Sequence, residues 1–450
     1  MNKTIEQTTV NIPMRPPLSV IWIYACGQLG WSLASYGVGS LLSYFYMPPE
    51  DTASRTLFPS YIPTLSFLGL TLLGLISFSG RLFDAFIDPF VANWSDKMTT
   101  SFGKRKTFMA IAALPLAATS YAMFHPMTEG VSVTNALWLT AVVFVFYVSL
   151  AMYMIPYAAL ISELGHVGSD RLRISTIISI TWALGFLIGN TTPALQGFFE
   201  SKGDPSVWAF QKTVGLFALL SVVFLLVPVF FLDEKKYALQ SESHENFIKS
   251  LQSVFQNRPF RYFATSYLLY WLALTFVQAG IIFYVTLLLG LDKSYATYFG
   301  IGSFFTSFLF YPLMGKLQAG FSKKTITLVA FLTFLVIFAI LLLPLEGIVR
   351  FILVTVLAAF PLATFGILPN TFVADCIHKN EALTGKNQAG MFYAVAAFMM
   401  KVGISLANLL FPSLLVYGKS VENPYGVQLT VVAAFVFCTA GYFVFRKYEE

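Results

Sequence analysis

The sequence predicts an all-α membrane protein with twelve transmembrane helices. Of its 450 residues, 57% are hydrophobic and only 11% are Asp, Glu, Lys or Arg, whereas a soluble domain carries about 25% charged residues. The mean hydropathy is +0.71. The apolar residues also gather in stretches of about 20 or more, the length that crosses about 30 Å of hydrocarbon. Together these observations exclude a soluble globular fold.

Twelve apolar stretches are long enough to cross a bilayer, and mostly short polar segments connect them. They lie at residues 18–46, 62–92, 107–124, 135–161, 174–197, 209–232, 262–289, 295–314, 325–345, 348–372, 388–415 and 425–445. The polar segment before the first stretch lacks the features of a removable signal peptide. The first span is therefore expected to be the insertion signal.

Lys and Arg are distributed unequally between the two sides of the membrane. If the N-terminus is cytoplasmic, 20 of the 28 basic residues lie on that side and six lie on the other, while Arg81 and Lys401 lie inside spans. Cytoplasmic loops are enriched in basic residues, so both termini are expected in the cytoplasm. The net charge of +6 follows from this bias and does not indicate a nucleic-acid partner.

The chain divides into two halves that share a weak repeat. The longest polar interruption follows the sixth span, which predicts an N-terminal six-helix bundle at 1–232, a cytoplasmic linker at 233–259 and a C-terminal six-helix bundle at 260–450. Pro156 precedes Glu163 in the first half, as Pro369 precedes Asp375 in the second. Paired six-helix repeats are typical of transporters of the major facilitator type.

The linker itself permits two interpretations. Phe247, Leu251 and Phe255 recur there at helical spacing, which is compatible with a short interfacial helix and equally with a plain connection.

Four charged residues lie well inside the spans: Arg81, Asp84, Asp88 and Lys401. Each costs about 2.5–3.5 kcal/mol at a helix centre, so the group needs shielding from lipid. Arg81, Asp84 and Asp88 are spaced i, i+3 and i+7, which places them on one face of the second span. With Lys401 the four charges sum to zero, so the set neutralises itself if the eleventh span faces the second.

Two carboxylates one turn apart repel each other unless a cation or proton lies between them. We therefore predict a cation or proton coupling site at Asp84 and Asp88, in preference to an inert ion network. Lys401 has three alternative roles: an anchor for a substrate anion, a surrogate cation for the empty site, or a structural counter-ion.

A second charged cluster surrounds the cytoplasmic loop between the second and third spans. Its basic residues help to fix the orientation of the chain, and we also expect them to form a salt-bridge latch that holds one access state. The predicted latch comprises Asp96, Lys97, Lys104, Arg105, Lys106, Glu163 and Asp375.

The second span resembles the signature of the glycoside–pentoside–hexuronide:cation symporters, the melibiose-permease-like family of the major facilitator superfamily. The resemblance is carried by Arg81-Leu82-Phe83-Asp84-Ala85-Phe86-Ile87-Asp88-Pro89, by Gly103-Lys104-Arg105-Lys106 and by Lys401-Val402-Gly403. It implies a major facilitator fold and substrate import coupled to Na⁺, Li⁺ or H⁺. It also implies that Asp84 and Asp88 are cation-site carboxylates, with Lys401 and Arg81 beside them.

Two departures from the family bear on the coupling ion. Ile87 occupies a position where the family's sugar carrier has an amide ligand, and Ala151 one where it has a hydroxyl ligand. Na⁺ prefers several oxygen ligands, whereas a proton needs only a carboxylate, so the residues favour H⁺ and leave Na⁺ open. No cofactor is expected beyond this coupling ion, H⁺ or Na⁺, and no metal beyond a Na⁺ at Asp84 and Asp88.

The sugar-clamping residues of that carrier are also replaced, so an α-galactoside bound in the same way is not expected. The predicted pocket is aromatic and neutral, which suits a sugar because aromatic rings stack on pyranose faces and amides pair with hydroxyls. Its candidate residues are Gln28, Trp31, Tyr36, Tyr153, Trp182, Asn190, Gln278 and Tyr393.

The sequence therefore predicts a secondary active transporter that carries a small polar solute, a sugar, glycoside or uronide, by symport with H⁺ or Na⁺. A lysolipid or amphiphile carrier of the same fold is the alternative, because an animal branch of the family moves lysolipids. A non-transporting receptor is less favoured, since no sizeable soluble domain is present. An enzyme is not expected, because no catalytic or metal-binding motif is found. The expected setting is a monomer in the bacterial inner membrane, with the lipid bilayer and a small-molecule substrate as partners.

Overall fold

The computed structural model describes residues 14–50, 57–64, 66–67, 69–98, 100–165, 168–238, 256–384 and 389–449. The interfacial helix considered at Phe247, Leu251 and Phe255 lies outside these described residues.

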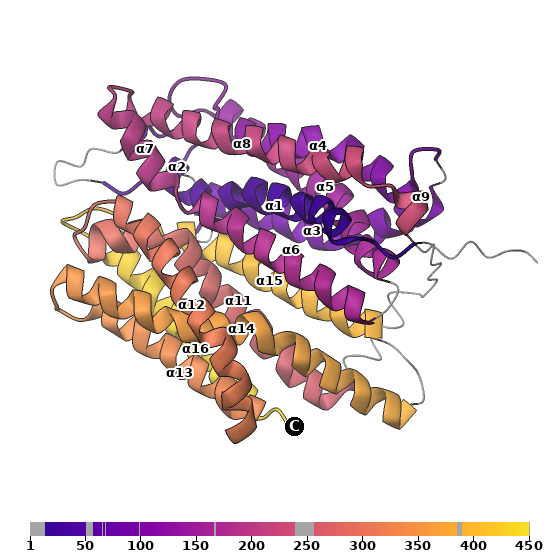
Figure 1. Ribbon diagram of the computed structural model, residues 1–450. Helices are drawn as coiled ribbons and strands as arrows, with labels where there is room; N and C mark the ends of the chain where they lie inside the picture. Colours follow the sequence, from indigo (N-terminus) through magenta and orange to yellow (C-terminus); the bar gives the residue numbers. More distant parts are fainter. Residues whose placement is uncertain are drawn as a thin grey trace, which may run out of the picture.

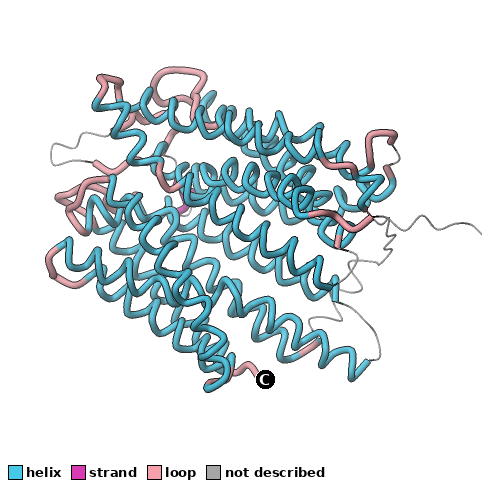
Figure 2. Tube along the Cα trace, viewed as in Figure 1, coloured by secondary structure: helices cyan, strands magenta, loops and turns pink. Residues whose placement is uncertain are grey.

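The structure is almost entirely helical (Figures 1 and 2). The N-terminal elements are α1 (Leu18–Tyr36), η1 (Gly37–Leu41), α2 (Leu42–Tyr46), β1 (Ser66–Phe67), β2 (Leu70–Thr71), α3 (Leu72–Lys97), α4 (Lys104–Ala122), α5 (Val133–Leu164), α6 (Gly168–Gly189), α7 (Thr192–Ser201), α8 (Ser206–Phe231) and α9 (Glu234–Tyr237). The C-terminal elements are α11 (Arg258–Phe283), η2 (Tyr284–Leu288), α12 (Ser294–Gly320), α13 (Lys323–Leu342), α14 (Gly347–Thr384), α15 (Ala389–Leu415) and α16 (Tyr425–Arg446).

Each predicted span contains one long helix, and twelve helices of the described residues have 19 or more residues. Eight helical segments in this part of the chain are long and apolar enough to cross a bilayer on composition alone. The second predicted span is not among the eight, and its helix α3 carries Arg81, Asp84 and Asp88. The polar residues that point to function therefore also weaken the hydropathy signal.

In two predicted spans the helix starts late or is interrupted. The predicted span 62–92 starts too early, since α3 begins only at Leu72. Before it, β1 and β2 pair as a short hairpin whose turn contains Gly69 at φ 80°. The Thr71 hydroxyl accepts a hydrogen bond from Gly74 N and thus caps the first turn of α3. The stretch 174–197 is interrupted after Gly189, and α7 begins with Pro193 in its first turn, where proline is tolerated.

The helices form two sets that pack mainly within themselves (Figure 1). In the set from α1 to α9, which we call the N set, α1 packs on α6 and α8, while α5 packs on α3 and α4. In the set from α11 to α16, the C set, α11 packs on α15 and α16, while α14 packs on α12 and α13. The most extensive contact between the sets joins α3 to α15.

The contact between α3 and α15 is antiparallel and close. Thr71 N donates to Ser413 Oγ at 3.0 Å at one end, and Phe86 packs edge-on against Phe398 nearer the other. A Cβ atom at Gly74 would lie 2.6 Å from the carbonyl oxygen of Leu409. The missing side chain of Gly74 therefore lets the two helices approach, as small residues do between membrane helices.

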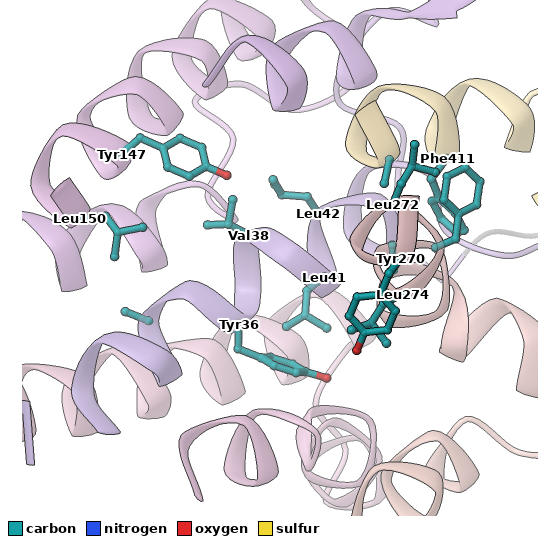
Figure 3. Close-up of a cluster of buried hydrophobic side chains, with 14 of the residues drawn as sticks. Tyr36, Val38, Leu41, Leu42, Tyr147, Leu150, Tyr270, Leu272, Leu274 and Phe411 are labelled. Atoms are coloured by element: carbon teal, nitrogen blue, oxygen red, sulfur yellow. The ribbon is translucent and has the colours of Figure 1, made fainter. Parts of the chain in front are cut away.

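A π-helical segment follows α1 directly, and another follows α11. Val38 and Leu41 of η1 belong to a buried apolar cluster with Tyr147 of α5 and Tyr270 of α11 (Figure 3). Because η1 and α2 also contact α11, this part of the first helix joins the N set to the C set. Isolated π segments are found often at functional sites.

We define two ends of the molecule by residues. The Glu50 end holds the C-terminal ends of α2, α7 and α15, and the Asp96 end holds those of α3, α5 and α14.

A matched pair of glycine substitutions tests the close contact of α3 with α15. Gly74→Ala is expected to lower the free energy of unfolding by about 1–3 kcal/mol, because the added methyl group meets a backbone carbonyl. Gly315→Ala in α12 places its methyl in open space, so it is expected to be neutral or stabilising. Thermal unfolding of the purified variants in detergent measures both, and equal stabilities would contradict the contact.

Candidate functional site

The charges inside the spans meet at the contact between α3 and α15. Lys401 Nζ lies 2.9 Å from Asp84 Oδ2 and 2.6 Å from Asp88 Oδ2. Arg81 Nη1 lies 3.1 Å from Asp84 Oδ2. One carboxylate oxygen of Asp84 thus faces both cations, and the ammonium of Lys401 bridges the two carboxylates. The structure brings all four residues together as a neutral group, which we call the charge cluster.

Helix geometry accounts for this arrangement. The spacing i, i+3 and i+7 aligns Arg81, Asp84 and Asp88 on one face of α3, and that face meets α15. On the other side, the Arg81 guanidinium carbon lies 5.6 Å from the centre of the Tyr147 ring of α5, a favourable cation–π distance. A Cβ atom at Gly80 would lie 3.1 Å from that ring, so a glycine permits the approach of α5.

Two atoms of the charge cluster have no hydrogen-bond partner among the described residues. They are Asp88 Oδ1 and Arg81 Nε, and both are buried. Asp84 is buried as a residue, whereas the Asp88 side chain is 26% exposed. An unpaired buried acceptor is costly and marks a position for a further partner. Asp88 is therefore the carboxylate of the cluster with an oxygen left for a further partner.

Arg105 is the hub of the predicted latch. Its guanidinium lies 2.6 Å from Asp96 Oδ1 and 2.7 Å from Glu163 Oε1, and it donates to Ser95 Oγ at 2.8 Å. The ion pairs described for this part of the chain do not include Lys97 or Lys104. These contacts join α3, α4 and α5 within the N set, so in this conformation the network is internal to one set.

Glu234 completes this network and was not predicted from the sequence. Its carboxylate accepts hydrogen bonds from the backbone N–H groups of Arg105, at 3.1 Å, and Lys106, at 3.0 Å. It therefore caps the N-terminus of α4, where a negative charge is favourable. Lys106 Nζ donates in turn to the carbonyl oxygen of Leu232 at 2.6 Å. In the sequence Glu234 is the second residue of the polar linker, and nothing there indicates a contact with a residue 129 positions away.

Asp375 lies apart from this network. It forms an ion pair with Lys323 at the start of α13, within the C set and at the Asp96 end. The ion-paired residues of the predicted latch thus form two clusters in the structure, one in each set.

The predicted pocket residues lie in several separate places. Tyr36 donates its hydroxyl hydrogen to Asn190 Oδ1 at 3.2 Å, and its ring stands edge-on to Phe186. Phe186 in turn lies 4.8 Å from the Trp182 ring. Tyr36, Trp182 and Asn190 therefore form an aromatic group with one amide between α1 and α6, extended by Phe186, which was not predicted.

The remaining pocket candidates do not join this group. Tyr153 is fully buried and donates to the carbonyl oxygen of Leu225 at 2.9 Å, so it packs α5 against α8. Gln28 is buried, and Trp31 has a buried indole N–H without a partner among the described residues. Gln278 is half-buried on α11, and Tyr393 is 44% exposed on α15.

The sequence profile of the family described as MFS/sugar transport protein matches residues 23–442. The chain belongs to this family. It is 23% identical over 335 residues to an uncharacterised symporter of Bacillus subtilis (strain 168), covering 73% of this chain and 71% of that protein. The glucuronide carrier protein homolog of Escherichia coli (strain K12) is 23% identical over 399 residues, covering 85% and 82%. The sodium-dependent lysophosphatidylcholine symporter 1 of Xenopus tropicalis is 21% identical over 400 residues, covering 79% and 75%.

Solved structures share the fold at low sequence identity. The nucleoside transporter NupG superposes with a TM-score of 0.66 at 14% identity, covering 96% of this chain and 100% of that one. A D-xylose–proton symporter does so with a TM-score of 0.66 at 14% identity, covering 96% and 98%. The chain is a multi-pass membrane transporter with the major facilitator fold and is not an enzyme. The predicted membership of the glycoside–pentoside–hexuronide:cation symporter family is confirmed.

Because Arg105 contacts Asp96, Glu163 and Ser95 together, its substitution is predicted to lower the stability of the protein strongly. Arg105→Met leaves Asp96 and the buried Glu163 without their cation, so we expect the free energy of unfolding to fall by about 3–5 kcal/mol. Lys97 lies beside Asp96 at the end of α3, and its side chain is exposed. Lys97→Met is therefore expected to change the free energy of unfolding by no more than about 0.5 kcal/mol. Chemical unfolding followed by tryptophan fluorescence measures both. A loss no larger for Arg105→Met than for Lys97→Met would contradict the network.

Proposed function

We propose that the protein is a cation-coupled symporter that moves a small polar solute, a sugar, glycoside or uronide, across the cytoplasmic membrane. The observation that carries this proposal is the bridge from Lys401 to both Asp84 and Asp88 across the contact of the two helix sets. The proposal includes twelve spans in two six-helix bundles, 1–232 and 260–450, joined by a linker at 233–259. It also includes cytoplasmic termini and a monomer in a bacterial inner membrane.

The charge cluster offers a physical route to coupling. Lys401 is held by α15, whereas its carboxylate partners are held by α3, so their attraction favours the contact between the sets. A cation or proton on Asp88 neutralises the nearer partner of Lys401 and weakens that attraction. A ligand shifts a conformational equilibrium only by its difference in affinity for the two states. Occupancy of Asp88 provides such a difference because it changes the free energy of separating α3 from α15.

We favour H⁺ as the coupling ion. Na⁺ needs several oxygen ligands, and at the two positions where the family's sugar carrier has further ligands this chain has Ile87 and Ala151, which supply no side-chain oxygen. The Lys401 ammonium also occupies the space between the carboxylates. A proton requires only one carboxylate oxygen, and Asp88 Oδ1 has no partner among the described residues. Na⁺ becomes the coupling ion in this proposal only if backbone carbonyls or a substrate complete its ligands.

The group formed by Tyr36, Trp182, Phe186 and Asn190 is our candidate for solute recognition. Aromatic rings provide faces for stacking on a sugar ring, and the amide of Asn190 provides hydrogen-bonding groups. The family description and the name of the glucuronide carrier homolog support a sugar or uronide as the class of solute.

A lysolipid or amphiphile is the second candidate class of substrate. The similarity to a sodium-dependent lysophosphatidylcholine symporter over 79% of this chain favours it, and so does the content of 46 Phe residues. In this alternative Lys401 holds the phosphate of the lipid. The two classes are separated by an uptake assay in proteoliposomes that offers a panel of sugars and uronides beside a labelled lysolipid.

The coupling role of Asp88 is tested with Asp88→Asn, which mimics the protonated carboxyl group. We expect accumulation of solute driven by an imposed H⁺ or Na⁺ gradient to fall by at least about tenfold, within the usual range of coupling between two sites. Exchange of solute at equal concentrations is expected to persist, since it needs no net cation movement. Asp204→Asn, a carboxylate far from the cluster in an exposed ion pair with Lys212, is the matched control. The coupling proposal is contradicted if Asp88→Asn accumulates solute in response to the gradient as well as Asp204→Asn does.

Substitution of Lys401 distinguishes its alternative roles. If the ammonium competes with the coupling ion, Lys401→Gln raises the apparent affinity for H⁺ or Na⁺ by about tenfold, which corresponds to about 1.4 kcal/mol. If it anchors an anionic substrate, the same change raises KM for uronides or lysolipids and leaves KM for neutral glycosides unchanged. Uptake measured against cation concentration, with one anionic and one neutral solute, separates the two results, and a loss of thermal stability alone indicates a structural counter-ion.

A further inference from the structure

The polar contacts described between the N set and the C set gather at the Glu50 end and midway along the helices. The charge cluster and the Thr71–Ser413 contact lie along α3 and α15, and the other contacts lie at the Glu50 end. The charged clusters of the Asp96 end, by contrast, centre on Arg105 and on the Lys323–Asp375 pair, and each lies within one set. In this conformation direct polar contacts therefore connect the two sets at the Glu50 end.

The first of these contacts at the Glu50 end joins two loops. Glu50 forms an ion pair with Lys419, and Lys419 Nζ also donates to the carbonyl oxygen of Pro48 at 2.9 Å. The main chains pair as well, because Glu50 N donates to the carbonyl oxygen of Lys419 at 2.9 Å. Segment 47–50, directly after α2, is thus attached to the loop between α15 and α16.

The second contact at this end is made by α7. Lys293 Nζ, just before α12, lies 2.5 Å from Glu200 Oε2 near the end of α7. The other oxygen of Glu200 accepts from Gln196 Nε2 at 3.0 Å, and Gln196 Oε1 accepts from the Tyr44 hydroxyl at 3.1 Å. Gln196 and Tyr44 are fully buried. A hydrogen-bonded chain therefore leads from α2 through α7 to a lysine of the C set.

The third contact is made by Asn190, two residues before α7, and also links a tyrosine of the first helix to the start of α12. The Thr297 hydroxyl of α12 donates to the carbonyl oxygen of Asn190 at 2.9 Å, while Asn190 Oδ1 accepts from Tyr36. Tyr36 and Tyr44 lie on either side of the π segment η1. Both flanks of η1 are thus hydrogen-bonded to the segment 190–200, which is bonded in turn to the start of α12.

We propose that segment 190–200 and segment 47–50 form the gate of the transport pathway at the Glu50 end. The ion pairs Glu200–Lys293 and Glu50–Lys419 hold this gate closed, and Gln196 with Tyr44 positions Glu200. The inference rests on the proposed transport function, because a gate is needed only where the two sets separate alternately at each end. Partly exposed ion pairs suit this task, since each contributes little enough to break in every cycle.

The gate is tested by distance measurements between spin labels in the full-length protein. Cys26, Cys376 and Cys438 are first replaced by Ala, and labels are then attached at Lys202→Cys with Glu422→Cys, which report on the Glu50 end. A second pair, Ser101→Cys with His378→Cys, reports on the Asp96 end. All four label positions are exposed, and each pair joins the N set to the C set.

Removing the lysines is expected to open the Glu50 end. Lys293→Gln and Lys419→Gln should each raise the ratio of long to short distances at that end by about two- to fivefold, with a matching shift to shorter distances at the Asp96 end. The double variant should multiply the two effects, since the pairs share no residue. Lys212→Gln is the matched control, because it breaks the 2.6 Å ion pair with Asp204 at the same end but within the N set.

Two further variants test how Glu200 is positioned. The exchanged pair Glu200→Lys with Lys293→Glu restores the attraction and is expected to return the distances to those of the natural protein. Tyr44→Phe leaves the buried Gln196 Oε1 without its donor, so it is expected to give part of the Lys293→Gln shift together with some loss of thermal stability.

The proposal is overturned if Lys293→Gln and Lys419→Gln leave both distance distributions unchanged, or if Lys212→Gln shifts them equally. The measurement needs neither solute nor an ion gradient. A negative result therefore rejects the gate and leaves the cation site at Asp88 untouched, whereas failure of the Asp88→Asn test leaves the gate intact.

Discussion

The ion bridge from Lys401 to Asp84 and Asp88 is the interaction on which the arrangement of the two helix sets depends. Neither carboxylate is tolerable in hydrocarbon alone, and their mutual repulsion makes the pair worse. The ammonium that neutralises them comes from the opposite set, so α3 and α15 must face each other. Gly74 and Ser413 then bring the backbones together along the rest of the contact, and α5 shields Arg81 through Tyr147.

The sequence predicts the features that a membrane environment requires of the amino-acid composition. Long apolar stretches are unavoidable in a bilayer, and for this reason each predicted span contains a long helix. The meeting of Lys401 with the carboxylates was foreseeable because four charges inside the spans sum to zero. The hairpin at residues 66–71 was not foreseeable, because its Ser-Phe-Leu-Gly-Leu-Thr composition differs little from that of the helix that follows.

Other parts of the site have no signature in the sequence. Tyr147 lies in an apolar stretch with several other aromatic residues, and only the position of Arg81 in space gives it a partner. Glu234 opens a run of linker charges, whereas in the structure its carboxylate caps a helix that begins at Lys104. The latch residues were grouped by charge and by repeat, but chain topology assigns Asp375 to the second set. Interactions that depend on distant segments therefore require the fold before they are visible.

The π segment after α1 determines the direction in which its neighbouring tyrosines point. Tyr36 and Tyr44 are eight residues apart, and in a continuous α-helix, at about 100° per residue, their side chains would diverge by about 80°. A π turn absorbs about one extra residue, which reduces the divergence to about 20° and sets both hydroxyls toward the same neighbour. A regular helix gives this alignment at a spacing of about seven residues and not at a spacing of eight. The segment Gly37–Leu41 therefore acts as a fixed rotation of about a quarter turn built into the backbone.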